Sequence, residues 1–478
     1  MQQTTAEQPL RAFRQAAYRT LGRRKDTLFE LLEAAVVSPG PAKLVHLSLA
    51  AVFRRRWPSA SDALAEGQVR PAQCRALIHR YVDEPPGAAR PVWAGDATTW
   101  ARPAAKTSRE RTWGHRSTPG IPQDGVVPAW EYEWLVEVPE PGSSWVRPLD
   151  VRRRGPRSGT PTAVAIRELK AALARRPRGA KRPVVAYDSS YDPITFARAG
   201  LAVDLLVRLR TNRRFYREPG PYPGRGRRRK HGEVFRLPDP ATHGAPDRTA
   251  TLEDPVHGRV RVDAWERLHG GAAADAPFTV VRIDVERLPR HAKRPKPLWL
   301  AWIGGPLPED LHDLWRWYRC RFIVEHGFRF LKHDLGWTAV HPRHPEAADR
   351  WSWLLALALR QLWLARPLVA DQRLPWERPL PSHRLTPARV RRACASLFPR
   401  LGTPARPVQT RGIPPGRRPG QRPPPPYSLL RLPQTPECAT EPETPTLTLS
   451  NRQILSAAKD LPSLTGWSGR SFAALRMT

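Results

Sequence analysis

The sequence predicts an α/β fold in which a mixed β-sheet is flanked by helices, with a helical domain before the sheet and a β subdomain inserted into it. Three observations lead to this prediction. Apolar residues recur at helical spacing before residue 84, strand-like and helix-like stretches alternate from about 90 to 305, and proline-rich sequence without periodicity begins near 401. A chain of 478 residues is long enough to bury a sizeable core in two or three domains.

The periodicity divides the chain into four parts. Residues 1–88 are expected to form a helical domain, 89–345 the sheet with a β insertion at about 211–296, 346–400 a C-terminal helical segment and 401–478 a disordered tail. The last part of that tail, QILSAAKDLPSLTGWSGRSFAALRMT, resembles the translation of a dispersed genomic repeat. We therefore expect the tail beyond about 425 to be read-through sequence without a role in activity.

The helical domain has apolar residues at helical spacing in LFELLEAAVV (28–37) and LVHLSLAAVFRRRW (44–57), separated by the helix-breaking SPGP. Basic runs at 23–25 and 54–56 are compatible with a DNA-binding module. Because no helix-turn-helix pattern is clear, a packing subdomain remains an alternative.

The predicted sheet follows from short aromatic and β-branched runs separated by loops and two helical stretches. The order is β-β-β-α-β-α-β, in the segments 92–96, 131–139, 144–153, 162–176, 184–188, 194–200 and 203–210. Strand character weakens after 211 and returns in the insertion at 258–268 and 278–288, and then at 298–305. Proline and acidic residues then open one long helix, about 308 to 334.

The charge of the chain indicates a polyanionic partner. Lys and Arg number 79 against 44 Asp and Glu, a formal net charge of +35, and arginine suits phosphate recognition. Nucleic acid is the leading expectation, with an arginine-rich genome or plain solubility as the alternatives. The four scattered cysteines form no CxxC pair, which excludes the common zinc and disulfide frameworks. No secretory signal or membrane span is expected, so a reducing cytosol fits best.

Two aspartates stand out because each ends a predicted strand: Asp96 in VWAGD and Asp188 in VVAYD. Carboxylates at the ends of adjacent buried strands repel each other unless a cation lies between them. Glu325, on the long helix expected to cross the sheet, supplies a third carboxylate. Three such oxygen ligands suit Mg²⁺ or Mn²⁺.

Taken singly, these residues have ordinary alternatives. Asp96 also suits a turn cap and Asp188 an Asx turn. Glu325 also suits an i,i+4 surface pair with Arg321. Asp192 competes with Asp188, but it precedes a proline and is expected to start the next helix.

A charged seam runs along the apolar segment YRCRFIVEHGFRFLK (318–332). The seam consists of Tyr318, Arg321, Glu325 and Lys332. At about 100° per residue, these four side chains project within roughly 60° of one another around the helix. Their spacing, Tyr318-x2-Arg321-x3-Glu325-x6-Lys332, resembles the Tyr-Arg-Glu-Lys motif of bacterial insertion-sequence transposases of the DDE type. With GDATTW and YDSSYD, the resemblance covers roughly residues 90 to 370.

The resemblance implies an RNase H-like core with an inserted β subdomain. It implies that the carboxylates are the catalytic residues and bind two Mg²⁺ ions, for which Mn²⁺ substitutes: Asp96, Asp188 and Glu325. It also implies that the rest of the seam binds DNA phosphates near the cut: Tyr318, Arg321 and Lys332. Arg and Lys beside a metal-binding Glu are suited to neutralise developing phosphate charge.

The function implied is metal-dependent cleavage at transposon ends and strand transfer into target DNA. The implied partners are the terminal inverted repeats, the target DNA and a second copy of the chain on DNA, with no membrane, in a bacterial cytoplasm near the nucleoid. An RNase H-like endonuclease without strand transfer and a decayed DNA-binding relic remain alternatives.

Several other residues are candidates for base stacking, metal binding or DNA contacts. Trp93 and Trp337 are candidates for stacking on a displaced base, with burial in the core as the more ordinary reading. His326 and His333 lie off the line of the seam and are poor candidates for metal ligands. The basic clusters at 152–157 and 224–230 are candidates for contacts to the DNA backbone, with solvated loops as the alternative.

Overall fold

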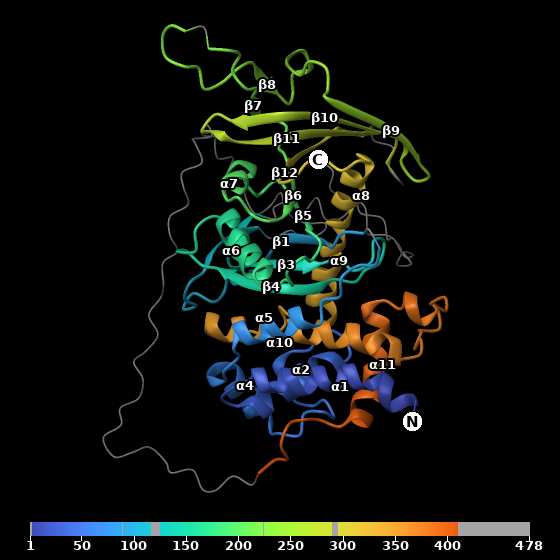
Figure 1. Cartoon of the computed structure of the whole chain (residues 1–478). Coiled ribbons are helices and arrows are strands. Elements are labelled where there is room, and N and C mark those ends of the chain that lie inside the picture. The colour runs from blue at the N-terminus through green and yellow to red at the C-terminus, as the bar shows by residue number, and fades with distance from the viewer. Residues whose placement is uncertain (1, 88, 116–124, 223, 289–294, 410–478) are drawn as a thin grey trace, which may run out of the picture.

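A computed structural model describes residues 2–87, 89–115, 125–222, 224–288 and 295–409 (Figure 1). The disorder and the read-through expected for the C-terminal tail therefore lie, beyond residue 409, outside the described residues. The elements form three tiers: the strands of the insertion at one end, the central strands with α6 and α7 in the middle, and most of the other helices at the opposite end (Figure 1).

A single 12-stranded mixed sheet organises the molecule. Its strands are β1 Val92–Ala101, β2 Thr112–His115, β3 Val126–Glu137, β4 Arg147–Arg154, β5 Val184–Tyr187, β6 Asp204–Arg208, β7 Arg214–Tyr216, β8 Val234–Arg236, β9 Arg248–Asp254, β10 Gly258–Gly270, β11 Ala273–Val285 and β12 Leu298–Ile303. Their order is β2-β3-β1-β5-β6-β12-β11-β10-β7-β8, with β4 paired to β3 and β9 to β10. The β insertion therefore extends the central sheet.

The central order β4-β3-β1-β5-β6 confirms the predicted RNase H-like core. Strands β1, β5 and β6 run parallel, whereas β3 pairs antiparallel with both β1 and β4. The prediction missed β2 and ended β1 too early, at Asp96. The strand continues because Thr98, Thr99 and Trp100 favour β structure and pair with β3.

Helices cover both faces of the sheet. They are α1 Gln2–Thr20, α2 Lys25–Val37, α3 Leu44–Leu47, α4 Trp57–Glu66, α5 Pro71–Arg80, α6 Pro161–Leu173, α7 Pro193–Arg198, α8 His312–Cys320, α9 Phe322–Arg329, α10 Pro345–Ala365 and α11 Pro387–Leu401. Helix α6 packs on β3 and β4 and α7 on β11 and β12, while α8 and α9 lie against β1. No helix among the described residues is both long and apolar enough to cross a membrane.

The long helix predicted over 308–334 is present in segments. It begins at His312, turns through Arg321 with helical dihedral angles between α8 and α9, and ends in a π-helical turn, η2 (Phe330–Asp334). The prediction of a helix over 44–57 is wrong after Leu47. There the buried Phe53 and the pairing of Arg54 with Glu30 hold an irregular segment instead.

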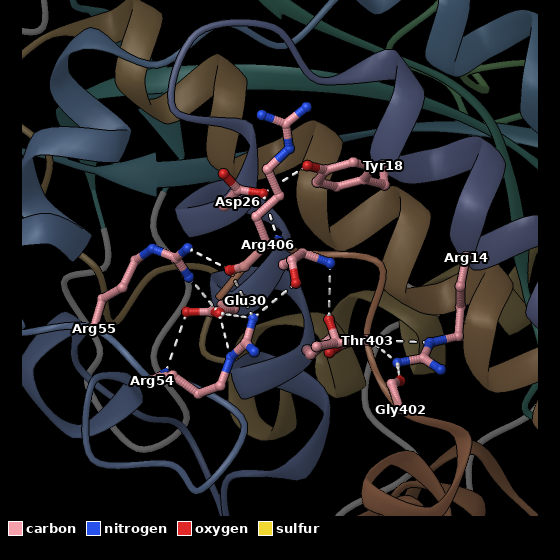
Figure 2. A network of polar contacts seen from close by, with 11 residues as sticks. Arg14, Tyr18, Asp26, Glu30, Arg54, Arg55, Gly402, Thr403 and Arg406 are labelled. Atoms are coloured by element: carbon pink, nitrogen blue, oxygen red, sulfur yellow. Dashed lines mark hydrogen bonds and ion pairs between the residues drawn. The ribbon is translucent and has the colours of Figure 1, made fainter. Parts of the chain in front are cut away.

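The N-terminal helices share one hydrophobic core with α10, α11 and the α9 face of the sheet. Residues 402–408, which we call the C-terminal strap, lie over α1 and α2. Figure 2 shows arginines from the N-terminal helices and loops reaching this strap: Arg14 donates to the Gly402 carbonyl at 2.7 Å and Arg54 to the Ala405 carbonyl at 2.9 Å. Asp26 accepts from the Arg406 amide at 2.9 Å. The strap thus joins the two ends of the described chain.

Candidate active site

The register of two parallel strands brings Asp96 and Asp188 together. Strand β1 pairs with β5 through Val92–Val184, Trp93–Val185 and Ala94–Ala186. Asp188 follows the last residue of β5, and continuing the same register places it beside Asp96. Because side chains alternate along a strand, both aspartates belong to the face of Ala94 and Ala186, on the side of α8 and α9.

The backbone at Asp96 is held from the opposite face by an aromatic ring. Gly95 lies so close to Tyr187 that an added Cβ atom would be 2.0 Å from the ring atom Cε1. A side chain at this position would force the strand or the ring to move. Glycine is therefore required here for close packing, and it fixes the strand position that carries Asp96.

Arg321 connects two of the predicted carboxylates. Its guanidinium donates to Asp96 Oδ2 at 3.0 Å and to Glu325 Oε1 at 2.8 Å. The Arg321 side chain is 7% exposed, Asp96 is 15% exposed and Glu325 is 57% exposed. The surface i,i+4 pair considered for Glu325 is thus present, but it is one half of a bridge to the sheet.

The electrostatics of the site centre on Asp96. Burial raises the pKa of Asp96 to about 7; Arg321 opposes this shift, and the charges of Asp188 and Glu325 add to it. Burial would lower the pKa of Arg321, but Asp96 and Glu325 hold it above its ordinary value. The charges of all three carboxylates therefore act on the buried Arg321 guanidinium.

Asp188 has its own local contacts. Its Oδ1 atom accepts from the backbone amide of Ser190 at 2.9 Å and from the Ser190 hydroxyl at 2.5 Å, so the Asx-turn geometry is present. Asp192 instead caps α7 by accepting from the Thr195 amide at 2.9 Å. The prediction that Asp192 starts the next helix is confirmed.

Tyr318 and an unpredicted residue, Arg208, lie near the aspartates. Tyr318 is fully buried, and burial raises its pKa while Arg321 and Arg208 lower it. Strand β6 pairs with β5 through Tyr187–Val207, and the next step of that register places Arg208 beside Asp188. Sequence reasoning identified the strand but missed Arg208, because only strand register reveals which of its side chains lines up with Asp188.

Lys332 is the last member of the seam. It lies in the π-helical turn η2, not in the regular helix that the sequence predicted. Its ammonium lies 5.9 Å from the centre of the Trp337 ring. Burial lowers the pKa of Lys332, and the negative charges of Glu131 and Asp96 oppose this shift. Lys332 thus interacts electrostatically with Asp96 and Glu131 but makes no ion pair with them among the described residues.

Residues 17–271, more than half of the chain, match the family of DDE superfamily endonucleases. The chain belongs to this family. This confirms the resemblance to DDE-type enzymes drawn from the sequence. The match includes Asp96 and Asp188 and ends before the seam. Among solved structures, the endonuclease is similar to a piggyBac transposase synaptic complex with hairpin DNA, at 11% identity and a TM-score of 0.39, covering 79% of this chain and 72% of that one. No curated protein matches the chain.

The carboxylates of the endonuclease fit a hard divalent ion by their chemistry, since all their donor atoms are oxygens. In the described ranges, however, no three acidic, His or Cys side chains stand close enough together to hold a metal ion. Arg321 lies between Asp96 and Glu325 instead. Of the two carboxylates that Arg321 contacts, Glu325 is the more exposed, at 57% against 15% for Asp96.

Other predicted candidates in the endonuclease have ordinary roles. Trp93 and Trp337 are both completely buried, so the core reading is confirmed and stacking on a base is not available to them. Trp337 packs with its ring centre 5.0 Å from that of Trp100. His326 and His333 are exposed.

The two basic clusters differ in their surroundings. The arginines at 152–154 belong to β4 and pair with acidic groups, Arg153 with Asp349 at 2.9 Å among them. The residues at 224–230 are exposed along one loop of the insertion. The loop cluster is thus the more accessible to a DNA backbone.

Proposed function

We propose that this endonuclease is the DNA transposase of an insertion sequence, which cleaves DNA at the ends of its element and joins the freed ends to target DNA. The observation that carries the proposal is the shared register of Asp96 and Asp188 on β1 and β5, with Glu325 linked to Asp96 through Arg321. The family match supports the nuclease part. The spacing of the seam supports the transposase part.

Asp96, Asp188 and Glu325 are the residues that would hold divalent ions, two Mg²⁺ with Mn²⁺ as substitute. When bound, such ions polarise the phosphodiester and lower the pKa of the attacking water. The chain itself holds Asp96 rigidly on β1 and carries Glu325 on the exposed side of α9. Glu325 is therefore the residue whose side chain would turn away from Arg321 to hold an ion.

Arg321 has a double role in this proposal. In the structure its guanidinium neutralises Asp96 and orients Glu325. If Glu325 held a metal ion, one side of the guanidinium would be free to donate to a DNA phosphate, a charge-assisted bond. Tyr318 packs behind it, and Lys332 supplies a second cation toward the DNA.

The proposed partners follow from the reaction. The substrate is DNA, both at the terminal inverted repeats and at the target, and the net charge of +35 favours binding to its phosphates. Two ends must be brought together for joining, so we propose two copies of the chain on DNA. The protein would act in the bacterial cytoplasm, at the nucleoid.

A second candidate is an endonuclease that cuts without joining, which the family description favours by naming only an endonuclease. The test is incubation of the purified protein and Mg²⁺ with DNA carrying the ends of the element. Cut ends and strand-transfer products are expected. Cut ends alone would favour the second candidate.

The active-site assignment is tested by Glu325→Gln, which keeps the size of the side chain and removes its charge. Both products should disappear while DNA binding is retained. Glu346→Gln is the matched control, because Glu346 is also a half-exposed helical glutamate paired with an arginine, Arg109 at 3.4 Å. Specific binding without cutting by the unaltered protein, in Mg²⁺ or in Mn²⁺, would show the chain to be a catalytically inactive relic.

A further inference from the structure

A second site lies at the edge of the sheet. A hollow of about 320 Å³ opens between α5, β4, α6 and α10, and we call it the β4 pocket. Strands β3 and β1 separate β4 from β5, which leads to Asp188. The pocket is therefore distinct from the candidate active site and lies where the N-terminal helices meet the catalytic sheet.

The lining of the β4 pocket is rich in arginine. Four guanidinium groups line it: Arg75, Arg152, Arg153 and Arg167. The remaining lining includes the apolar side chains of Val151, Val164 and Trp353. Asp349 is the acidic residue that lines the pocket, so cations outnumber anions on its walls.

Two of these arginines are held by acidic partners. Arg75 donates to the fully buried Asp150 at 2.7 Å and lies 5.4 Å from the centre of the Trp353 ring. Arg153 binds Asp349 through two nitrogens, at 2.9 and 3.1 Å. These pairs fix the walls of the pocket and leave little binding capacity on those two side chains.

The other two arginines keep donors for a ligand. Arg152 uses only its Nε, which donates to Asp150 Oδ2 at 3.0 Å; its terminal nitrogens have no hydrogen-bond partner among the described residues. Arg167 uses one terminal nitrogen, which donates to the Ser158 carbonyl at 2.7 Å. Free guanidinium donors on a partly buried wall favour a multivalent oxyanion.

The acidic groups beneath the pocket do not cancel this preference. Asp150 is shared between Arg75 and Arg152. Glu168 is also buried below; burial and the charge of Asp150 raise its pKa well above the ordinary value, while Arg152 and Arg75 oppose this shift. At ~30 Å³ per water, the pocket has room for about ten water molecules, which is enough for a phosphate and its remaining hydration shell.

We propose that the β4 pocket binds a phosphate group, with Arg152 and Arg167 as its donors. The phosphate is either a free ion or part of a DNA backbone, and the latter source rests on the proposed function. In that case the pocket anchors the DNA at the junction of the N-terminal helices and the sheet, away from the site of cleavage.

The first test is calorimetric titration of the full-length protein with inorganic phosphate at constant ionic strength. Arg167→Gln is the main variant, because Arg167 is exposed and its loss leaves no buried charge unpaired. It should weaken phosphate binding at least about tenfold, the effect of losing one charge-assisted hydrogen bond. Arg152→Gln should act in the same direction.

The control is Arg178→Gln. Arg178 is an exposed arginine beyond the opposite end of α6 and does not line the pocket, so the change in net charge is identical. Phosphate affinity in this variant should equal that of the unaltered protein.

The second test separates the two sources of phosphate through the salt dependence of DNA binding. Loss of one backbone contact lowers the slope of log K against log salt by about 0.9. A lower slope in Arg167→Gln than in Arg178→Gln identifies DNA as the source. An unchanged slope with weakened inorganic phosphate binding identifies a free phosphate.

The proposal is overturned if Arg167→Gln and Arg178→Gln are indistinguishable in both measurements. This result is separable from a failure of the proposed function, because titration with inorganic phosphate requires neither cleavage nor strand transfer. Loss of cleavage in Glu325→Gln likewise says nothing about the pocket.

Discussion

The guanidinium of Arg321 lies 3.0 Å from the carboxylate of Asp96, within the group of acids that the sequence assigns to metal binding. A cation supplied by the chain itself thus stabilises a buried carboxylate on the central strand. The pair explains why an apolar helix carries a charged seam: the seam meets a charge of opposite sign on the sheet.

The Arg321–Asp96 pair should contribute to the stability of the fold. Arg321→Gln should lower the free energy of unfolding by about 3 kcal/mol, because the buried Asp96 loses its compensating charge. Urea denaturation measures the change. The control is Arg316→Gln on α8, whose side chain is 56% exposed and pairs with Asp310 and Asp313; an exposed pair contributes about 1 kcal/mol or less. Equal losses in the two variants would contradict the structural role of Arg321.

Metal binding should stabilise the fold. Mg²⁺ at about a hundred times its dissociation constant raises the free energy of unfolding by about 2.7 kcal/mol. The corresponding rise in melting temperature should disappear in Asp96→Asn and in Asp188→Asn. Asp192→Asn makes the same charge change nearby, and Asn is an equally good helix cap, so it should keep the full metal response. A metal response retained in all three variants would place the ions elsewhere.

Close packing at Gly95 should make this position intolerant of any side chain. Gly95→Ala places a Cβ atom 2.0 Å from the Tyr187 ring and should cost about 1–3 kcal/mol through overpacking. Cleavage should fall as well, because the strand beneath Asp96 shifts. Gly220→Ala is the control, since no atom lies within 4 Å of its added Cβ. Denaturation curves that coincide for the two variants would rule out the close approach.

Stability should depend on pH through Glu133. This side chain is 1% exposed, and burial raises its pKa to about 7, whereas Tyr191 and Arg154 oppose the shift. Because the folded-state pKa lies above the ordinary value of 4.5, the folded protein retains the proton more tightly. The stabilisation from this group is complete below that ordinary value and is lost as the pH rises through about 7.

Glu133→Gln should remove this dependence, since the amide does not titrate and still accepts the hydrogen bond from Tyr191. At about 1.36 kcal/mol per pH unit, the unaltered protein should lose roughly 3 kcal/mol relative to the variant as the pH rises from about 5 to about 8. Denaturation at the two pH values measures the difference. A stability difference that does not change with pH would refute the assignment.

The sequence alone was sufficient for the order of the central elements and for the family. Alternating apolar and aromatic runs predicted β1, β3, β4, β5 and β6 with their helices, since local patterning reflects which face of an element is buried. The spacing of the seam on one helix identified Arg321 and Glu325 as neighbours, and they do pair. These are short-range properties, determined within a few residues of chain.

The arrangement of the side chains in the candidate site depends on contacts between segments far apart in the sequence. Sheet register, set by many contacts between distant strands, aligned Asp96 with Asp188 and added Arg208, which no local pattern marks. The bond from Arg321 to Asp96 on the sheet and the π-helical turn that contains Lys332 also depend on packing. The sequence by itself therefore determined the central elements and the candidate acidic residues, whereas only the tertiary structure decided which side chains meet, because those contacts join residues far apart in the chain.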